Sequence, residues 1–198
     1  NDAHSDVRKE VIRKVGTMND LHLLSRLFPL LNDQNAEIRA ETAKVLQPYT
    51  QAQVIEACLK QFQIETDDFV RGELAHTLSI VCDKRILPPF LKAIEHDQHW
   101  YVRLMAVDIM EKVGDLSAKT ALIKALLDPD CSVRTRAAKV LDLKQWMPAT
   151  VTEQVYYWLA KEEHRQLLSL GVSAMIPLTT IMNQNPVFQK QARTLLEQ

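Results

Sequence analysis

An acidic residue precedes an arginine by six positions at five places in the chain, and these pairs recur at an almost constant interval. The pairs are Asp2/Arg8, Asp33/Arg39, Glu65/Arg71, Asp97/Arg103 and Asp128/Arg134. Successive arginines are 31, 32, 32 and 31 residues apart. A fixed period of this size is typical of arrays in which one small structural unit stacks on the next. We therefore expect a repeat protein rather than a fold built around one central core.

Each arginine is surrounded by apolar or small residues at helical spacing. An aliphatic residue precedes it, and small or apolar residues follow at three, four and seven positions, as in Val133, Ala137, Ala138 and Leu141 around Arg134. These positions share one face of an α-helix, so each unit contains an amphipathic helix that begins near its arginine. We call these helices the ladder helices. Residues suited to cap such helices stand four positions before the arginine position, at Asn35, Asp67, Asp130 and Asn185.

A second apolar segment lies between consecutive ladder helices. These segments are Leu21–Leu31, Val54–Ile64, Ile86–Ile94 and Ala118–Leu127. Pro29, Pro88 and Pro89 predict kinks or helix starts within them. No segment alternates as a strand does, and the chain has only 4 glycines. The sequence therefore predicts an all-α protein whose unit is helix, short turn, helix.

The segment Leu126–Leu141 carries the pattern in its clearest form. It reads Leu-Leu-Asp-Pro-Asp-Cys-Ser-Val-Arg-x-x-Ala-Ala-x-x-Leu, which resembles the short type of HEAT repeat, the version also seen in phycobilin lyases. The resemblance covers nearly the whole chain. It implies a right-handed α-solenoid of stacked two-helix repeats. It also implies that the acidic residues and arginines form a ladder through the stack, with the acid in the turn before the helix accepting hydrogen bonds from the guanidinium.

The repeats suggest how the chain is organised. We expect a single solenoid over residues 1–198, with regular repeats over 1–143, an irregular helical insertion over 144–170 and a terminal repeat over 171–198. Within the insertion, Trp146, Tyr156 and Trp158 are predicted to be packing residues, since large aromatic side chains mostly supply buried area. Because the sequence begins with Asn and its first unit has only the second helix, we expect a fragment of a longer protein.

The surface of the ladder helices is the first candidate binding site. If the handedness of HEAT arrays holds, these helices line the concave surface, where solenoids bind partners. Six apolar residues project from positions that face away from the core, namely Val45, Ile80, Leu104, Met105, Ile109 and Val140, and we centre the site on the first five. Exposed apolar patches often mark binding sites, so we predict a groove that accepts a partner helix or peptide. The alternative is that these side chains pack against adjacent ladder helices.

The turn His96–Tyr101 is the second candidate. Trp100 and Tyr101 follow polar residues at the predicted edge of the array, which suits interface anchors. A purely structural role is the main alternative. His96 and His99 with an acidic residue could bind a metal, but this spacing alone is weak evidence for one, and we predict no metal and no cofactor.

Composition narrows the function classes. With 24 Lys and Arg against 25 Asp and Glu, the net charge of −1 lacks the basic excess of nucleic-acid-binding solenoids, so nucleic acid is an unfavoured partner. Three cysteines without metal or disulfide spacing favour the cytoplasm. There is no apolar run near the roughly 20 residues of a membrane span and no recognised catalytic motif. The leading hypothesis is a non-catalytic protein-interaction scaffold of undetermined oligomeric state. The alternatives are a factor resembling phycobilin lyases or chaperones and, less favoured, a nucleic-acid binder.

Overall fold

The computed structural model describes residues 3–18, 20–114 and 116–196. All regular structure within these ranges is helical, so the all-α prediction is confirmed, and the helix pairs follow one another as in an α-solenoid. The chain divides into two compact units, Asn1–Val113 and Gly114–Gln198.

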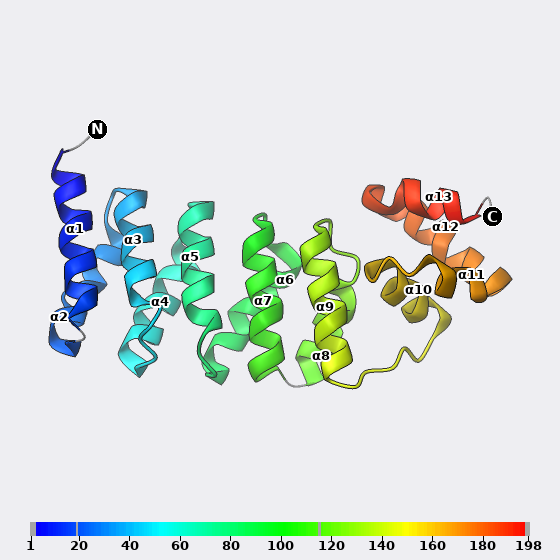
Figure 1. Cartoon of the computed structure of the whole chain (residues 1–198), viewed down its shortest axis with the longest axis horizontal. Coiled ribbons are helices and arrows are strands. Elements are labelled where there is room, and N and C mark those ends of the chain that lie inside the picture. Colours follow the sequence, from blue (N-terminus) through cyan, green and yellow to red (C-terminus); the bar gives the residue numbers. More distant parts are fainter. Residues whose placement is uncertain (1–2, 19, 115, 197–198) are drawn as a thin grey trace. The chain divides into compact units, whose positions relative to one another are not determined.

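The first unit contains four ladder helices and the segments that connect them (Figure 1). The ladder helices are α1 (Ala3–Thr17), α3 (Ala36–Leu46), α5 (Asp68–Ser79) and α7 (Trp100–Val113). The connecting segments are α2 (Leu21–Ser25), η1 (Phe28–Asn32), α4 (Ala52–Ile64), η2 (Lys84–Ile86) and α6 (Leu87–His96). Each ladder helix packs against the next one along the chain, and α3, α5 and α7 also pack against the segment that precedes them.

Local chemistry explains where these helices begin. The side chains of Asn35 and Asp67 accept hydrogen bonds from main-chain N–H groups in the first turns of α3 and α5, as predicted for N-caps. Proline near the start of a helix does not interrupt its hydrogen bonds. Accordingly, Pro88 and Pro89 lie in the first turn of α6. Pro29 lies in the first turn of η1, after α2 has ended, so Leu21–Leu31 is a broken segment rather than one helix.

The second unit has one regular pair followed by shorter helices. Its elements are α8 (Leu116–Ala125), α9 (Cys131–Leu143), α10 (Val151–Ala160), α11 (His164–Ser169), η3 (Gly171–Ala174), α12 (Met175–Gln184), η4 (Pro186–Phe188) and α13 (Gln189–Leu196). Asp130 and Asn185 cap α9 and η4, again as predicted. Gly171 has a φ of 55°, a left-handed conformation that glycine adopts without strain, and it ends α11 where η3 begins.

The aromatic residues of the insertion have the packing role predicted for them. Trp146 is buried, and Tyr156 and Trp158 pack against an apolar core that includes Val155 and Phe188. Tyr157 was not predicted to take part. Its hydroxyl donates a hydrogen bond to the carboxylate of Asp142, which attaches α10 to α9, and its ring lies 5.8 Å from that of Trp146.

Candidate partner-binding face

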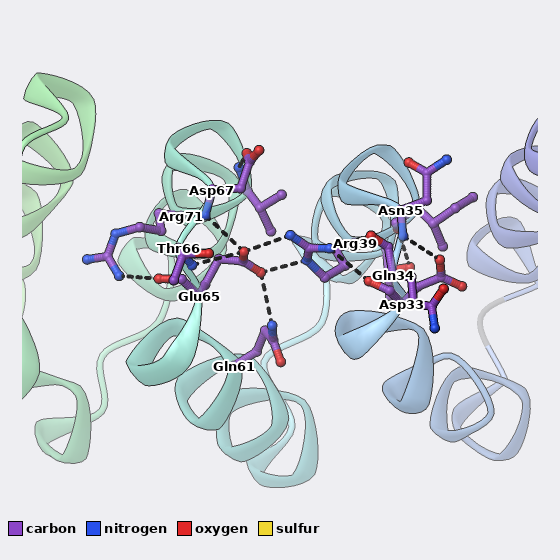
Figure 2. A network of polar contacts seen from close by, with 12 residues as sticks. Asp33, Gln34, Asn35, Arg39, Gln61, Glu65, Thr66, Asp67 and Arg71 are labelled. Atoms are coloured by element: carbon purple, nitrogen blue, oxygen red, sulfur yellow. Dashed lines mark hydrogen bonds and ion pairs between the residues drawn. The ribbon is translucent and has the colours of Figure 1, made fainter. Parts of the chain in front are cut away.

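Arg39 shows how the acidic residues and arginines are used (Figure 2). Its Nη1 donates to the carbonyl oxygen of Asp33 at 2.8 Å and to that of Gln34 at 3.3 Å, in the turn that precedes its own helix. Its Nε and Nη2 donate to the two carboxylate oxygens of Glu65 in the next repeat, both at 2.8 Å. One guanidinium therefore fixes its own turn and holds the following repeat.

The same forward pairing recurs within the first unit. Arg8 binds the carboxylate of Asp33 at 3.1 Å, and Arg71 binds that of Asp97 with its Nε at 3.1 Å. The residue six positions before an arginine thus accepts through its main-chain carbonyl, while its carboxylate binds the arginine of the preceding repeat. This corrects the simplest interpretation of the sequence, in which each carboxylate binds the arginine that follows it. Asp2 lies outside the described residues.

Each acidic residue also stabilises its own turn. One carboxylate oxygen accepts from the main-chain N–H two residues later; the distances are 2.8 Å for Asp33, 3.1 Å for Glu65, 3.0 Å for Asp97 and 2.8 Å for Asp128. Arg103 and Arg134 likewise donate from Nη1 to the carbonyls of Asp97 and Asp128, at 2.9 and 2.8 Å. These hydrogen bonds hold the turns of the array, so the network has a structural role.

Glu65 is the most strongly perturbed carboxylate of this network. Burial alone would raise its pKa, but hydrogen bonds from Arg39, Gln61 and the main chain of Asp67 outweigh burial and lower the pKa to about 2. A carboxylate with so low a pKa is ionised throughout the neutral range and is a poor proton acceptor. The network therefore offers no general base.

A second set of ion pairs joins consecutive ladder helices directly. Arg13 binds Glu41 at 2.6 Å, and Lys44 binds Glu73 at 3.4 Å. In both, a basic residue five positions after one arginine meets a glutamate two positions after the next arginine. The two basic side chains are thus compensated by carboxylates, which gives no support to a nucleic-acid surface at these positions.

Between α5 and α7, contacts between aromatic rings take the place of these ion pairs. His76, five positions after Arg71, has its ring 6.2 Å from that of Tyr101, and Trp100 packs edge to face on Tyr101 at 5.6 Å. A Cβ atom on Gly72 would lie 3.2 Å from the Tyr101 ring, so the absence of a side chain there lets the ring lie close to α5. Burial, with the charges of Glu73 and Asp108, raises the pKa of Tyr101 and keeps its hydroxyl protonated.

The predicted partner-binding residues divide into a group that solvent reaches and a group that is buried. Trp100 and Ile80 have 43% and 41% of their surface exposed, and Tyr101, Leu104 and Val45 are half-buried.

The prediction that Met105, Ile109 and Val140 project from the core is wrong, since they are 7%, 0% and 0% exposed. The sulfur of Met105 accepts a hydrogen bond from Ser79 of α5 at 3.5 Å, and the side chain of Val45 lies directly against Gly16 of α1. Positions two and six after each arginine therefore face the preceding ladder helix. Ile109 occupies the same position in its repeat as Val45, which explains why it does not face solvent.

Phe69 belongs to this face but was not predicted. Its ring is 58% exposed, and the ammonium group of Lys44 lies 4.9 Å from the ring centroid. The signal was in the sequence: two positions before the arginine, the other repeats have Asp6, Glu37 and Ser132, whereas the third and fourth have Phe69 and Tyr101. We call Phe69, Trp100, Tyr101, Leu104 and Ile80 the α5–α7 face.

Other kinds of site find no support in the part of the chain that the structure describes. No group of three His, Cys, Asp or Glu side chains there is placed to hold a metal ion. None of the described helices is long and apolar enough to cross a membrane.

The comparison with known families agrees with the repeat geometry. The HEAT-repeat family matches residues 1–79 and 82–152, and the chain belongs to this family. A search of curated proteins returned no match for the chain. The matched residues include α1 to α9, and so every residue of the α5–α7 face except Ile80.

Proposed function

We propose that the chain is a non-catalytic scaffold that binds a helix or an extended peptide of a partner protein on the α5–α7 face. The observation that carries the proposal is a change along the ladder helices, from ion pairs that join α1, α3 and α5 to the ring contacts of His76, Tyr101 and the exposed Trp100 between α5 and α7. HEAT repeats are commonly protein-interaction scaffolds, and such a change marks one part of the array as different from the rest.

The chemistry of this face suits a protein partner. Large aromatic residues dominate binding energy at protein interfaces because they bury much area at a low cost in conformational entropy. Trp100 and Phe69 leave about half of their surface exposed. Glu73 and His76 lie near Tyr101 and carry polar groups that can hydrogen-bond the main chain or polar side chains of a partner.

The cysteines support a reducing compartment, and we propose the cytoplasm. All three are free: Cys58 is buried, and Cys82 and Cys131 are exposed. Exposed free thiols persist where the environment keeps them reduced. A scaffold in that compartment would act without a cofactor.

A comparison of matched variants tests the proposal. The chain is immobilised, proteins from cells of the source organism are captured and identified, and a purified partner is titrated against the wild type. We expect Trp100→Ala and Phe69→Ala each to raise the dissociation constant at least tenfold, as interface anchors do. Met147→Ala is the control, because Met147 is 80% exposed and belongs to the second unit. Equal affinity of all four proteins, with circular dichroism showing intact folding, would exclude the α5–α7 face.

A further inference from the structure

The connecting helices α4 and α6 line a pocket of about 550 Å³ in the first unit, which we call the α4–α6 pocket. One side of α6 forms much of it, with Pro88, Pro89, Lys92, Ala93 and His96. The end of α4 adds Phe62 and Gln63, and Arg71 and Asp97 of the ladder complete the lining. The described residues that line this pocket include none of the α5–α7 face, so it is a separate site.

The wall around Phe62 is held in place by ring and guanidinium contacts. The ring of Phe62 is buried and stacks on that of Phe90, with centroids 4.5 Å apart. The guanidinium of Arg71 lies 4.7 Å from the centroid of the Phe62 ring. The Nη1 of Arg71 donates to the carbonyl oxygens of Phe62 and Glu65 at 3.2 and 3.0 Å, and its Nε donates to Asp97. An occupant would meet a surface that is already ordered, which lowers the entropic cost of binding.

The pocket offers more hydrogen-bond donors than acceptors. Lys92 and His96 are exposed and lie one turn apart on α6. Within the part of the chain that the structure describes, neither has a hydrogen bond or an ion pair. By contrast, both carboxylate oxygens of Asp97 are engaged, one by Arg71 and the other by the main-chain N–H of His99. An ammonium group carries three donors and no acceptor, so a complementary occupant must supply acceptors.

We propose that the α4–α6 pocket binds a carboxylate group carried on an apolar body. The charges of Arg71 and Asp97 cancel, and Lys92 leaves one positive charge, which matches a carboxylate better than a doubly charged phosphate. Phe62 and Pro88 provide apolar contact for the body of the ligand. Ligand sites combine such contact with a few polar groups that orient the ligand. Two sources share this chemistry: a free organic acid and the C-terminal carboxylate of a peptide.

Nuclear magnetic resonance tests the proposal on the full chain, with the ring signal of His96 as the reporter. Titration with phenylacetate should shift this signal to saturation, whereas the neutral phenylacetamide should leave it unchanged. Lys92→Gln should raise the dissociation constant of phenylacetate about fivefold, the upper range for a partly exposed charge contact. Lys60→Gln is the matched control, because Lys60 is also exposed but does not line the pocket. Both variants should keep the wild-type melting profile.

A second ligand separates the two sources. N-acetylphenylalanine carries its carboxylate next to an amide, as the end of a peptide does, so tighter binding than that of phenylacetate would assign the pocket to a peptide terminus. Equal or weaker binding would assign it to a free organic acid.

Four results would overturn the proposal. They are the absence of a saturable shift with phenylacetate, equal affinity of the wild type and Lys92→Gln for it, an equal response to phenylacetamide, and tighter binding of inorganic phosphate. Trp100→Ala should bind phenylacetate as the wild type does, so these results are independent of the scaffold proposal.

Discussion

Arg39 and Glu65 join two consecutive repeats through two parallel hydrogen bonds of 2.8 Å, with 14% of the arginine side chain and 2% of the glutamate side chain exposed. This bidentate geometry is specific to a guanidinium and a carboxylate. Since Arg39 also donates to two carbonyls of its own turn, this one side chain ties that turn to the following repeat.

Removal of Arg39 should therefore destabilise the first unit. We expect Arg39→Ala to lower the free energy of unfolding by about 3–5 kcal/mol, because it leaves the buried charge of Glu65 without its main partner. Chemical denaturation followed by circular dichroism measures the change. Arg13→Ala is the control, because it removes an ion pair whose arginine is half exposed, and such pairs contribute little in water. Similar losses of unfolding free energy in the two variants would mean that burial does not strengthen the Arg39 ion pair.

Stability should depend on pH through Glu65. Because its pKa in the folded chain is lowered to about 2 from an ordinary value of 4.5, the stabilisation is complete above about pH 4.5 and is lost as the pH falls towards 2. A shift of this size corresponds to at most about 3 kcal/mol. Glu65→Gln should be less stable than the wild type at pH 7, and the difference should shrink below pH 4.5 as the wild-type carboxylate takes up its proton. Denaturation at several pH values measures both, and a difference that does not vary with pH would contradict the assignment.

The hydroxyl of Tyr157 should contribute measurably to the attachment of α10 to α9. Burial, followed by the hydrogen bond to Asp142, raises the pKa of Tyr157, so the hydroxyl stays a donor at neutral pH. Tyr157→Phe should cost about 0.5–1.5 kcal/mol, the usual net contribution of one hydrogen bond, because the Asp142 side chain is 40% exposed and keeps Lys161 as a partner. Tyr156→Phe is the matched control, since the neighbouring ring packs on the same core. An equal effect of the two substitutions on the melting temperature would argue that the Asp142 contact is not stabilising.

The three cysteines should differ sharply in reactivity. Burial raises the pKa of the Cys58 thiol to about 12, so at neutral pH it holds almost no reactive thiolate. Cys82 and Cys131 are exposed. A thiol reagent added to the folded chain should label these two rapidly and Cys58 only after denaturation, with mass spectrometry of peptides to locate the label. Rapid labelling of native Cys58 would show that the α4 region opens readily.

The sequence alone determined the repeat architecture, because its signals are local. The spacing of apolar residues around each arginine sets the buried side of a helix whatever its neighbour does, and Asn35, Asp67, Asp130 and Asn185 cap their own first turns. Residues Trp146, Tyr156 and Trp158 were likewise correctly predicted to pack, since rings of that size seldom remain in solvent when a core is near.

Tertiary structure decided which residues meet across repeats. The pairing of Arg39 with Glu65 rather than with the carboxylate of Asp33 follows from the reach of a guanidinium between stacked helices. Met105 and Ile109 have the same helical phase as positions that a single helix would expose, yet they are buried, while Trp100 remains in solvent. The physical reason is that the exposure of a flanking position depends on the angle and spacing at which the next helix packs, and these depend on contacts between residues about 30 positions apart.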